Sequence, residues 1–318
     1  MKLIIQIPCY NEEKTLKSVL KELPTKIKWI SEIETMIIDD GSSDKTISIA
    51  SKFGIDYIVK HTWNKGLWNA FKSWVHKALI EWADILVNTD WDNQYPWKHI
   101  PDLVKPIIEW KTDIVMGNRQ TSKISHFSII KKIFQWFWSL IVRILSWTKV
   151  PDSVSWFRAY SKESLLRLNV TSDFSYAVDT LIQAWSKRLK IVDIIITTNK
   201  PTRPSRLFKN IWHHMYKTAQ ILLRVYAMYN PMRLFFSLWA IFLAVWSIWI
   251  IRFLYYFLTI DWDTGKVQSL VLSWTFIIMA TIFFALWIIG DLIAKNRKLI
   301  EDDLYLTKKQ YYEKNKGY

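Results

Sequence analysis

Two long apolar segments near the carboxyl end constrain the fold of this chain more than any other feature. Residues 234–251 (LFFSLWAIFLAVWSIWII) and 267–290 (VQSLVLSWTFIIMATIFFALWIIG) contain no charged side chain. A helix of about 20 apolar residues is long enough to cross the hydrocarbon core of a bilayer. We therefore predict a transmembrane helical hairpin. The alternative is a pair of core helices buried within a soluble protein.

Positive charge is concentrated on both sides of this predicted hairpin. The chain has a formal net charge of +15, and no Asp or Glu lies between Asp193 and Asp261. Because basic flanks stay on the cytoplasmic side, we expect both ends of the hairpin in the cytoplasm. Contact with a lipid membrane then accounts for the positive charge, and nucleic acid is not expected as a partner. The cations are Lys200, Arg203, Arg206, Lys209, Lys217, Arg224 and Arg233 before the hairpin, and Lys295, Arg297 and Lys298 after it.

The amino-terminal part is expected to lie in the cytoplasm as well. The apolar run in MKLIIQIPCYNEE is too short for a signal peptide before acidic residues follow. The single cysteine, Cys9, has no partner for an internal disulfide. The sequence thus predicts a protein of the cytoplasmic membrane whose catalytic part faces the cytoplasm.

Short apolar runs alternate with helical patterns through the first 120 residues. This alternation predicts an α/β fold with a mostly parallel sheet that is covered on both faces. Ligands of such sheets gather at the carboxyl ends of the strands. The predicted strands are LIIQI (3–7), TMIID (35–39), DYIVK (56–60), DILVN (84–88) and DIVMG (113–117), and EEKTLKSVLKEL (12–23) is a predicted helix.

Three polar clusters follow the predicted strands. PCYNEE (8–13) follows the first, DDGSSDKT (39–46) the second and TDWDNQYP (89–96) the fourth, so they are expected to converge on one crevice. In the last cluster, Asp90 and Asp92 offer hard oxygen ligands that suit Mg²⁺ or Mn²⁺ together with substrate phosphates. A cation there would neutralise the charge that builds on a departing nucleoside diphosphate.

The order of these motifs resembles that of the family 2 glycosyltransferases of the GT-A fold. Within that family the chain is similar to polyprenol-phosphate sugar synthases such as dolichol-phosphate mannose synthase. The resemblance covers essentially the whole chain and rests on several motifs in family order and spacing. They are IPCYNEEKTL, IIDDGSSDKT, NTDWDNQYP, GNRQ, DSVSWFRAYSKES and TRPSRLFKNI, followed by the hairpin.

The resemblance implies a donor site with a metal ion. Asp90, Asp92 and Gln94 match the family's metal site, although Gln94 could also be an ordinary turn amide. For Asp39 and Asp40, a turn that caps the helix after GSSDKT is the alternative. The positions that match the family's nucleoside site are Pro8, Tyr10, Glu12, Asp39 and Asp40.

Four arginines are candidates to bind phosphate. Arg119 lies at the end of a predicted strand, Arg158 lies within SWFRAY, and Arg203 and Arg206 match the family's basic segment before the membrane. Guanidinium forks suit phosphate oxygens. The alternative for each is a solvated or lipid-facing cation. By resemblance alone, Asp179 in FSYAVDT is expected near the acceptor.

These residues predict metal-dependent, inverting transfer of a sugar from a nucleotide-sugar donor to a polyprenyl phosphate, either undecaprenyl or dolichyl. A phosphate acceptor is already anionic near neutral pH, so positioning and charge neutralisation suffice without a strong base. A processive polysaccharide synthase is one alternative, but the nearest approach to its QxxRW motif, Gln220 to Val225, has the wrong spacing. An inactive membrane scaffold that binds nucleotide sugar or lipid headgroups is the other.

The sequence divides into four predicted parts. They are a GT-A glycosyltransferase domain (1–205), a basic juxtamembrane interfacial helix (206–230), the transmembrane hairpin (231–293) and a basic cytoplasmic tail (294–318). The motifs are common to enzymes with UDP or GDP donors, different hexoses and different polyprenols. They leave these choices open, together with assembly into a homo-oligomer.

Glycine is scarce in this chain and tryptophan is abundant. Average usage predicts roughly 22 glycines in a chain of this length, yet there are 7, beside 20 tryptophans. Tryptophan recurs where family members have glycine, and an indole cannot supply the backbone freedom of that residue. We hypothesise that the gene uses UGA for glycine and is read here with UGA as tryptophan, in which case the printed chain would fold poorly. The positions are Trp68, Trp74, Trp82, Trp91, Trp147, Trp156 and Trp185.

Overall fold

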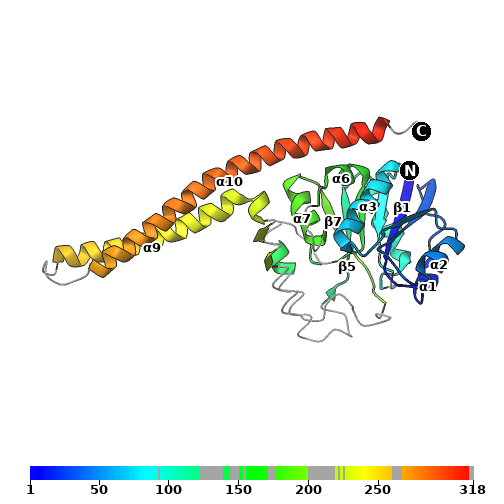
Figure 1. Cartoon of the computed structure of the whole chain (residues 1–318), viewed down its shortest axis with the longest axis horizontal. Helices are drawn as coiled ribbons and strands as arrows, with labels where there is room; N and C mark the ends of the chain where they lie inside the picture. The colour runs from blue at the N-terminus through cyan, green and yellow to red at the C-terminus, as the bar shows by residue number, and fades with distance from the viewer. Residues whose placement is uncertain are drawn as a thin grey trace. The chain divides into compact units, whose positions relative to one another are not determined.

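A seven-stranded sheet forms the centre of the amino-terminal part of the computed structural model (Figure 1). Two compact units are present, one made of Met1–Leu222 with Asp303–Tyr318 and the other of Leu223–Asp302. The structure describes residues 1–91, 94–121, 139–143, 150–152, 155–170, 176–199, 219–220, 223–224, 226–259 and 267–314.

The sheet has the order β3-β2-β1-β4-β6-β5-β7. Strand β6 runs antiparallel to β4 and β5, whereas the other pairs are parallel. Because β4 and β5 are both antiparallel to β6, they end at the same edge of the sheet. The strands are β1 (Lys2–Cys9), β2 (Glu32–Asp39), β3 (Tyr57–Lys60), β4 (Ile85–Asn88), β5 (Ile114–Asn118), β6 (Arg158–Ser161) and β7 (Ile191–Ile195).

The mostly parallel α/β fold predicted from the sequence is confirmed, and all five predicted strands are present. Strands β1 and β4 are apolar on both faces because helices cover both sides of the sheet. Strands β6 and β7 were not predicted. The first is only four residues long and contains an arginine, and the second contains Asp193.

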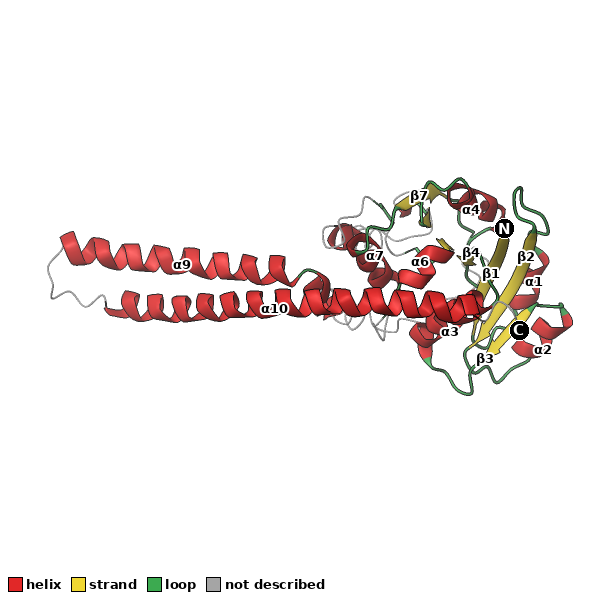
Figure 2. Ribbon diagram, turned by 90° about the horizontal axis from the view of Figure 1, so that it is seen from above, coloured by secondary structure: helices red, strands yellow, loops and turns green. Residues whose placement is uncertain are grey.

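Helices form a layer on each face of the sheet (Figure 2). Leu3, Ile5 and Ile7 of β1 pack with one layer, made of α1, α2 and α4. The opposite layer contains α3, α6 and α7, and Trp74 of α3 lies 6.0 Å from the ring of Tyr160 in β6. These helices are α1 (Leu16–Lys21), α2 (Thr46–Lys52), α3 (Gly66–Ile80), η1 (Trp97–His99), α4 (Ile100–Ile108), α6 (Lys162–Arg167) and α7 (Tyr176–Ser186).

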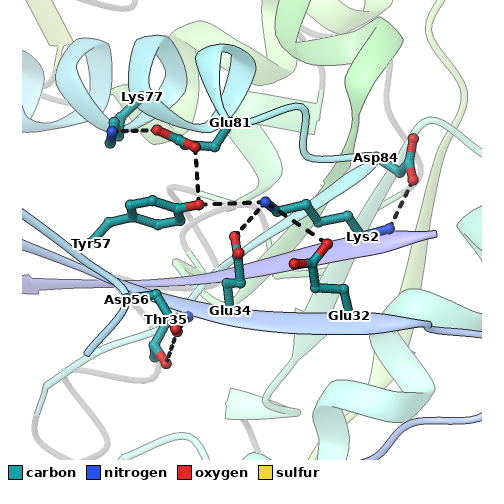
Figure 3. A network of polar contacts seen from close by, with 9 residues as sticks. All are labelled: Lys2, Glu32, Glu34, Thr35, Asp56, Tyr57, Lys77, Glu81 and Asp84. Atoms are coloured by element: carbon teal, nitrogen blue, oxygen red, sulfur yellow. Dashed lines mark hydrogen bonds and ion pairs between the residues drawn. The ribbon is translucent and has the colours of Figure 1, made fainter. Parts of the chain in front are cut away.

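A polar network joins the amino-terminal ends of β1, β2 and β3 to the end of α3 (Figure 3). The Nζ atom of Lys2 lies 2.7 Å from Oε2 of Glu34, and the hydroxyl of Tyr57 donates to Oε2 of Glu81 over 3.0 Å. Burial, followed by the hydrogen bonds to Glu34 and Glu81, raises the pKa of Tyr57 well above its ordinary value. The phenol therefore stays protonated and can donate. This network stabilises the edge of the sheet opposite the strand carboxyl ends.

Two long apolar helices make up most of the second unit, α9 (Pro231–Thr259) and α10 (Val267–Lys314). Both are long and apolar enough to cross a membrane, and the protein buries little of their most apolar stretches. A core helix of a soluble protein, the alternative, would be mostly buried. Phe242 and Phe283 stack between the two helices at 5.1 Å. Gly290 allows a close approach, because an added Cβ would lie 2.8 Å from Cβ of Pro231.

The last turns of α10 contact the α/β unit. The hydroxyl of Tyr305 donates to Oε2 of Glu163 over 3.2 Å, and a hydrogen bond of 2.7 Å joins Tyr312 to Nδ1 of His76. The final part of the predicted tail thus packs as helix on α3 and α6. Much of the predicted interfacial helix (206–230) lies outside the described residues, and the predicted domain boundaries stay predictions.

Candidate active site

The predicted site residues lie where parallel strands end. Asp39 is the last residue of β2, Asp90 follows β4 by two residues and Arg119 follows β5 directly. Since β1, β2, β4 and β5 run in one direction, these ends lie along one edge of the sheet. The predicted convergence of the polar clusters therefore has a structural basis in the sheet topology.

The turn after β2 is fixed by its own carboxylates. Both oxygens of Asp39 lie within 3.3 Å of the Ser42 amide, and the Asp39 side chain is fully buried. Gly41 has a φ of +81°, and a Cβ there would lie 2.7 Å from the carbonyl carbon of Trp63. Only glycine fits such a position, so the DDGS turn and the segment around Trp63 are held in close contact.

Asp40 caps a helix in this structure. Its Oδ1 accepts a hydrogen bond from the amide of Lys65 and its Oδ2 one from the amide of Gly66, each over 2.9 Å. His61 lies 2.7 Å from Oδ1 as well. Both oxygens are thus engaged at the amino terminus of α3. The capping alternative holds in a modified form, because the capped helix is α3. At the helix after GSSDKT it is Asp44 that accepts from the Thr46 amide.

The first cluster surrounds the carboxyl end of β1. Pro8 lies in the strand and is half-buried, whereas the ring of Tyr10 is exposed. Glu12 is buried, and its Oε2 accepts a hydrogen bond from the hydroxyl of Thr15 over 3.1 Å. An exposed aromatic ring and a buried carboxylate therefore lie close together in sequence at the end of this strand.

Buried polar groups precede the half-buried Asp90. The side chain of Asn88 donates to the carbonyl of Trp156 over 2.7 Å and to the hydroxyl of Tyr176 over 2.9 Å. In the described part of the chain, the buried Oδ1 of Asn88 and hydroxyl of Thr89 have no hydrogen-bond partner. A buried polar atom without a hydrogen-bond partner costs free energy of folding. In a native structure it therefore needs an explanation, such as a bound ion or water.

Arg119 and Asp152 form a buried, bidentate ion pair. Nε of Arg119 donates to Oδ2 over 2.7 Å and Nη2 donates to Oδ1 over 2.8 Å. Burial opposes the charge of Arg119, but the electrostatic influence of Tyr95, Asp152 and Asp90 raises its pKa above the ordinary value. Burial also raises the pKa of Tyr95 to about 12, helped by Asp90 and Asp152 and opposed by Arg119. These four side chains therefore act on one another electrostatically.

Sequence reasoning missed Asp152 and Tyr95. Both lie within motifs that carried the family resemblance, DSVSWFRAY and NTDWDNQYP. The sequence signal that could have identified Asp152 is that an acidic residue stands shortly before a strand in a chain rich in cations. Its pairing with Arg119, 33 residues earlier, appears only in the structure.

Arg158 makes hydrogen bonds to protein groups on two sides. Its side chain is fully buried in β6. Nε donates to the carbonyl of Ser155 over 2.7 Å, and Nη1 donates to the carbonyl of Ala177 and the hydroxyl of Thr180, each over 2.9 Å. The guanidinium therefore joins the segment before β6 to the first turns of α7, and its phosphate-binding role stays a prediction.

Asp179 is also fully buried, and its Oδ1 accepts a hydrogen bond from Nε2 of Gln183 one turn later in α7. Its expected place near the acceptor stays a prediction. Of the other predicted site residues, Gln94 is half-buried, and its backbone carbonyl accepts from the amide of Asn199 over 3.0 Å. Asp92, Arg203 and Arg206 lie outside the described residues.

The donor atoms at the end of β4 fit a hard divalent cation. Among the described residues, no three side chains of His, Cys, Asp or Glu form a complete metal site. Magnesium usually needs only one or two carboxylates, because substrate phosphates and waters fill the remaining positions. Asp90 supplies an oxygen ligand of the right kind at the end of β4. The residues present therefore fit Mg²⁺ or Mn²⁺.

Comparison with known proteins decides the family. The sequence model of glycosyl transferase family 2 (Glycos_transf_2) matches residues 4–168, which is more than half of the chain. The chain belongs to glycosyl transferase family 2. This family 2 chain is therefore a glycosyltransferase, as its motifs predicted.

Relatives of this family 2 chain transfer sugars to polyprenyl phosphates. It is 29% identical over 213 residues to UDP-N-acetylglucosamine--dolichyl-phosphate N-acetylglucosaminyltransferase from Methanococcus voltae, with 60% of this chain and 83% of the relative covered. It is 24% identical over 207 residues to undecaprenyl-phosphate mannosyltransferase from Micrococcus luteus, with 62% and 83% covered.

A solved structure supports the GT-A fold. Glucosyl-3-phosphoglycerate synthase from Mycobacterium tuberculosis, in complex with Mn²⁺, UDP-glucose and glycerol 3-phosphate, superposes with a TM-score of 0.52 at 19% identity. The match covers 71% of this chain and 79% of the synthase. At this identity the likeness concerns the fold alone.

Replacing Arg158 by methionine is expected to destabilise the family 2 chain by about 3 kcal/mol or more, because buried carbonyl and hydroxyl acceptors lose their donors. Denaturant unfolding of the purified protein measures this loss. The matched control is Arg167→Met, which removes an exposed ion pair with Glu163 and should cost under about 1 kcal/mol. A stable Arg158→Met protein that has lost donor affinity would instead support the predicted phosphate role.

Proposed function

We propose that this glycosyltransferase moves a sugar from a nucleoside diphosphate to a polyprenyl phosphate at the cytoplasmic face of a membrane. The observation that carries the proposal is the grouping of Asp90, Tyr95, Arg119 and Asp152 at the carboxyl edge of the sheet. Acidic and basic groups held together at such an edge suit a ligand that combines phosphate with a cation. The names of the relatives support the acceptor class.

The donor would lie across the ends of β1, β2 and β4. The exposed ring of Tyr10 offers a flat apolar surface to a nucleobase, and the buried carboxylates of Glu12 and Asp39 offer hydrogen-bond acceptors to base and ribose. Asp40 stabilises this surface indirectly, because its hydrogen bonds fix the amino terminus of α3. Asp90 and Arg119 would then bind the diphosphate end of the same donor.

Transfer replaces one bond at the anomeric carbon by another. A phosphate oxygen of the lipid forms a bond to this carbon, and the bond to the diphosphate breaks with its electron pair moving to the diphosphate oxygen. Attack from the side opposite the leaving group inverts the configuration. Mg²⁺ or Mn²⁺, when bound by Asp90 and Asp92, supplies charge neutralisation at the leaving diphosphate. The acceptor is already an anion, so no strong base is required.

The two apolar helices suit an acceptor that is a lipid. Arg233 lies at the start of the most apolar part of α9, and Lys295, Arg297 and Lys298 follow that of α10. Cations at these places favour the cytoplasmic surface and its anionic headgroups. A polyprenyl phosphate in the same leaflet would present its charged group at that surface.

Replacing Asp90 by asparagine should lower the rate of transfer by roughly 100-fold or more, because a ligand of the cation is lost. Labelled UDP-sugars and GDP-sugars are supplied to membranes that contain the full chain, with undecaprenyl or dolichyl phosphate, and the lipid product is counted. Chelation of divalent cations should abolish the signal. Asp102→Asn, at an exposed carboxylate of α4, is the control and should leave the rate unchanged.

Other results would contradict the proposal in distinct ways. Binding of nucleotide sugar without any transfer would favour an inactive scaffold. Growth of a long sugar polymer would favour a processive synthase. Full activity of Asp90→Asn at ordinary Mg²⁺ would remove the metal role from this residue.

A further inference from the structure

The carboxylate of Asp152 is committed to a single partner. Its Oδ2 accepts from Nε of Arg119 over 2.7 Å and from the Arg119 backbone amide over 3.2 Å, while Oδ1 accepts from Nη2 over 2.8 Å. The Asp152 side chain is 4% exposed and that of Arg119 is 9% exposed. A bidentate pair of this kind fixes the plane of the guanidinium as well as its position.

The pair leaves part of the guanidinium available. Within the described residues, Nη1 of Arg119 has no hydrogen-bond acceptor, although Nε and Nη2 are both engaged. Asp90 lies close enough to influence the pKa of Arg119. The available N–H groups are therefore held near the carboxylate that would bind the donor's cation.

We propose that Asp152 is a positioning residue, which acts on the transfer reaction only by orienting Arg119 toward the diphosphate of the donor. This inference rests on the proposed function. Without Asp152 the long arginine side chain would be free to adopt other rotamers, and its donors would not be set for the charge that develops on the leaving group.

A double-mutant cycle on transfer activity tests the inference, with Asp152→Ala, Arg119→Ala and the double variant compared with the parent. Asp152→Ala should lower kcat by roughly 10- to 100-fold. In the Arg119→Ala background the same change should have no further effect. Thermal unfolding of each variant confirms that the compared samples are folded.

A conservative variant adds a second readout. Arg119→Lys cannot form the bidentate pair, so it should lose activity to an extent similar to Asp152→Ala. The inference is overturned if Asp152→Ala is fully active, or if it costs the same factor with and without Arg119. Absence of transfer by the parent chain would instead count against the proposed function itself.

A second inference comes from the backbone and does not depend on function. Helices α2, α3, α4 and α7 end in the same way, with a residue of positive φ two positions after the last helical residue. After α2 this residue is Gly54, with φ 71°, but after α3 it is Trp82, with φ 59°, after α4 it is Trp110, with φ 55°, and after α7 it is Arg188, with φ 56°. Glycine is the usual residue at this position, because any Cβ is strained there.

The hydrogen bonds confirm that these are true helix ends. The Ala83 amide donates to the Ala78 carbonyl over 3.0 Å, and the Lys111 amide donates to the Pro106 carbonyl over 3.0 Å. Each bond spans six residues and requires the left-handed residue between its partners. Trp29, with φ 71°, lies in a different setting, the third position of a four-residue turn that is closed by the Ile30 amide and the Ile27 carbonyl, where a positive φ also favours glycine.

Burial does not compensate for this strain. Trp110 is 85% exposed and Trp29 is 57% exposed. In contrast, Trp74 in the middle of α3 is fully buried, with its ring 4.5 Å from that of Phe71. Positions 29, 82 and 110 thus favour glycine, whereas Trp74, which the sequence also suggested as a glycine position, is accommodated as tryptophan. Trp82 was among the positions suspected from sequence, whereas Trp29 and Trp110 were not.

The geometry points to glycine at residues 29, 82 and 110 of the natural protein, where the printed sequence has tryptophan. This agrees with the hypothesis that UGA encodes glycine in the source of the gene. Decoding UGA as glycine would also place glycine at residue 91, between the two predicted metal-binding carboxylates. A small residue there leaves room for a sugar diphosphate.

Two measurements test this second inference. The gene should carry UGA at codons 29, 82 and 110, and peptide masses of the protein from its source should contain glycine there; UGG codons would overturn it. In the printed chain, Trp82→Gly and Trp110→Gly together should raise the midpoint of thermal unfolding by roughly several degrees, whereas the control Trp74→Gly should lower it. A lower midpoint for the first pair would also contradict the inference.

Discussion

The common direction of β1, β2, β4 and β5 is the constraint on which the rest of the structure depends. Because these strands end at one edge, side chains that are up to 111 residues apart in sequence, from Pro8 to Arg119, share one side of the sheet. The polar network of Lys2, Glu34, Tyr57 and Glu81 stabilises the opposite edge. The amino-terminal edge of the sheet therefore stabilises the fold, and the carboxyl-terminal edge is available to bind ligand.

The parts of the fold predicted from sequence are those with a local signal. Strand β4 is a buried apolar run bounded by polar residues, and the apolar segments of α9 and α10 contain no charge, so length and composition identified them. Strand β6 gives no such signal, because Arg158 is buried by acceptors in α7 that sequence does not place nearby. The predicted phosphate role of Arg158 stays a prediction.

The site was predictable in its residue types and less so in its pairings. Asp90 and Arg119 follow strands, as the sequence indicated. That Asp40 holds the start of α3, 25 residues later, and that Asp152 holds Arg119 are consequences of tertiary structure. Such buried carboxylates position the residues that contact a ligand. Neither spacing nor composition shows which carboxylate contacts the ligand and which one positions another residue. Positive φ at Trp82 and Trp110 is likewise a property of helix ends that only the backbone shows.

Binding of a nucleoside diphosphate with a divalent cation tests the account's central claim most directly. Calorimetric titration of the purified full chain with UDP and with GDP is carried out with and without Mn²⁺, and repeated on Asp90→Asn. We expect one of the two nucleotides to bind only when Mn²⁺ is present, with affinity reduced roughly 100-fold in the variant. Equal binding without the cation, or by the variant, would contradict a cation-dependent donor site at the carboxyl edge of the sheet.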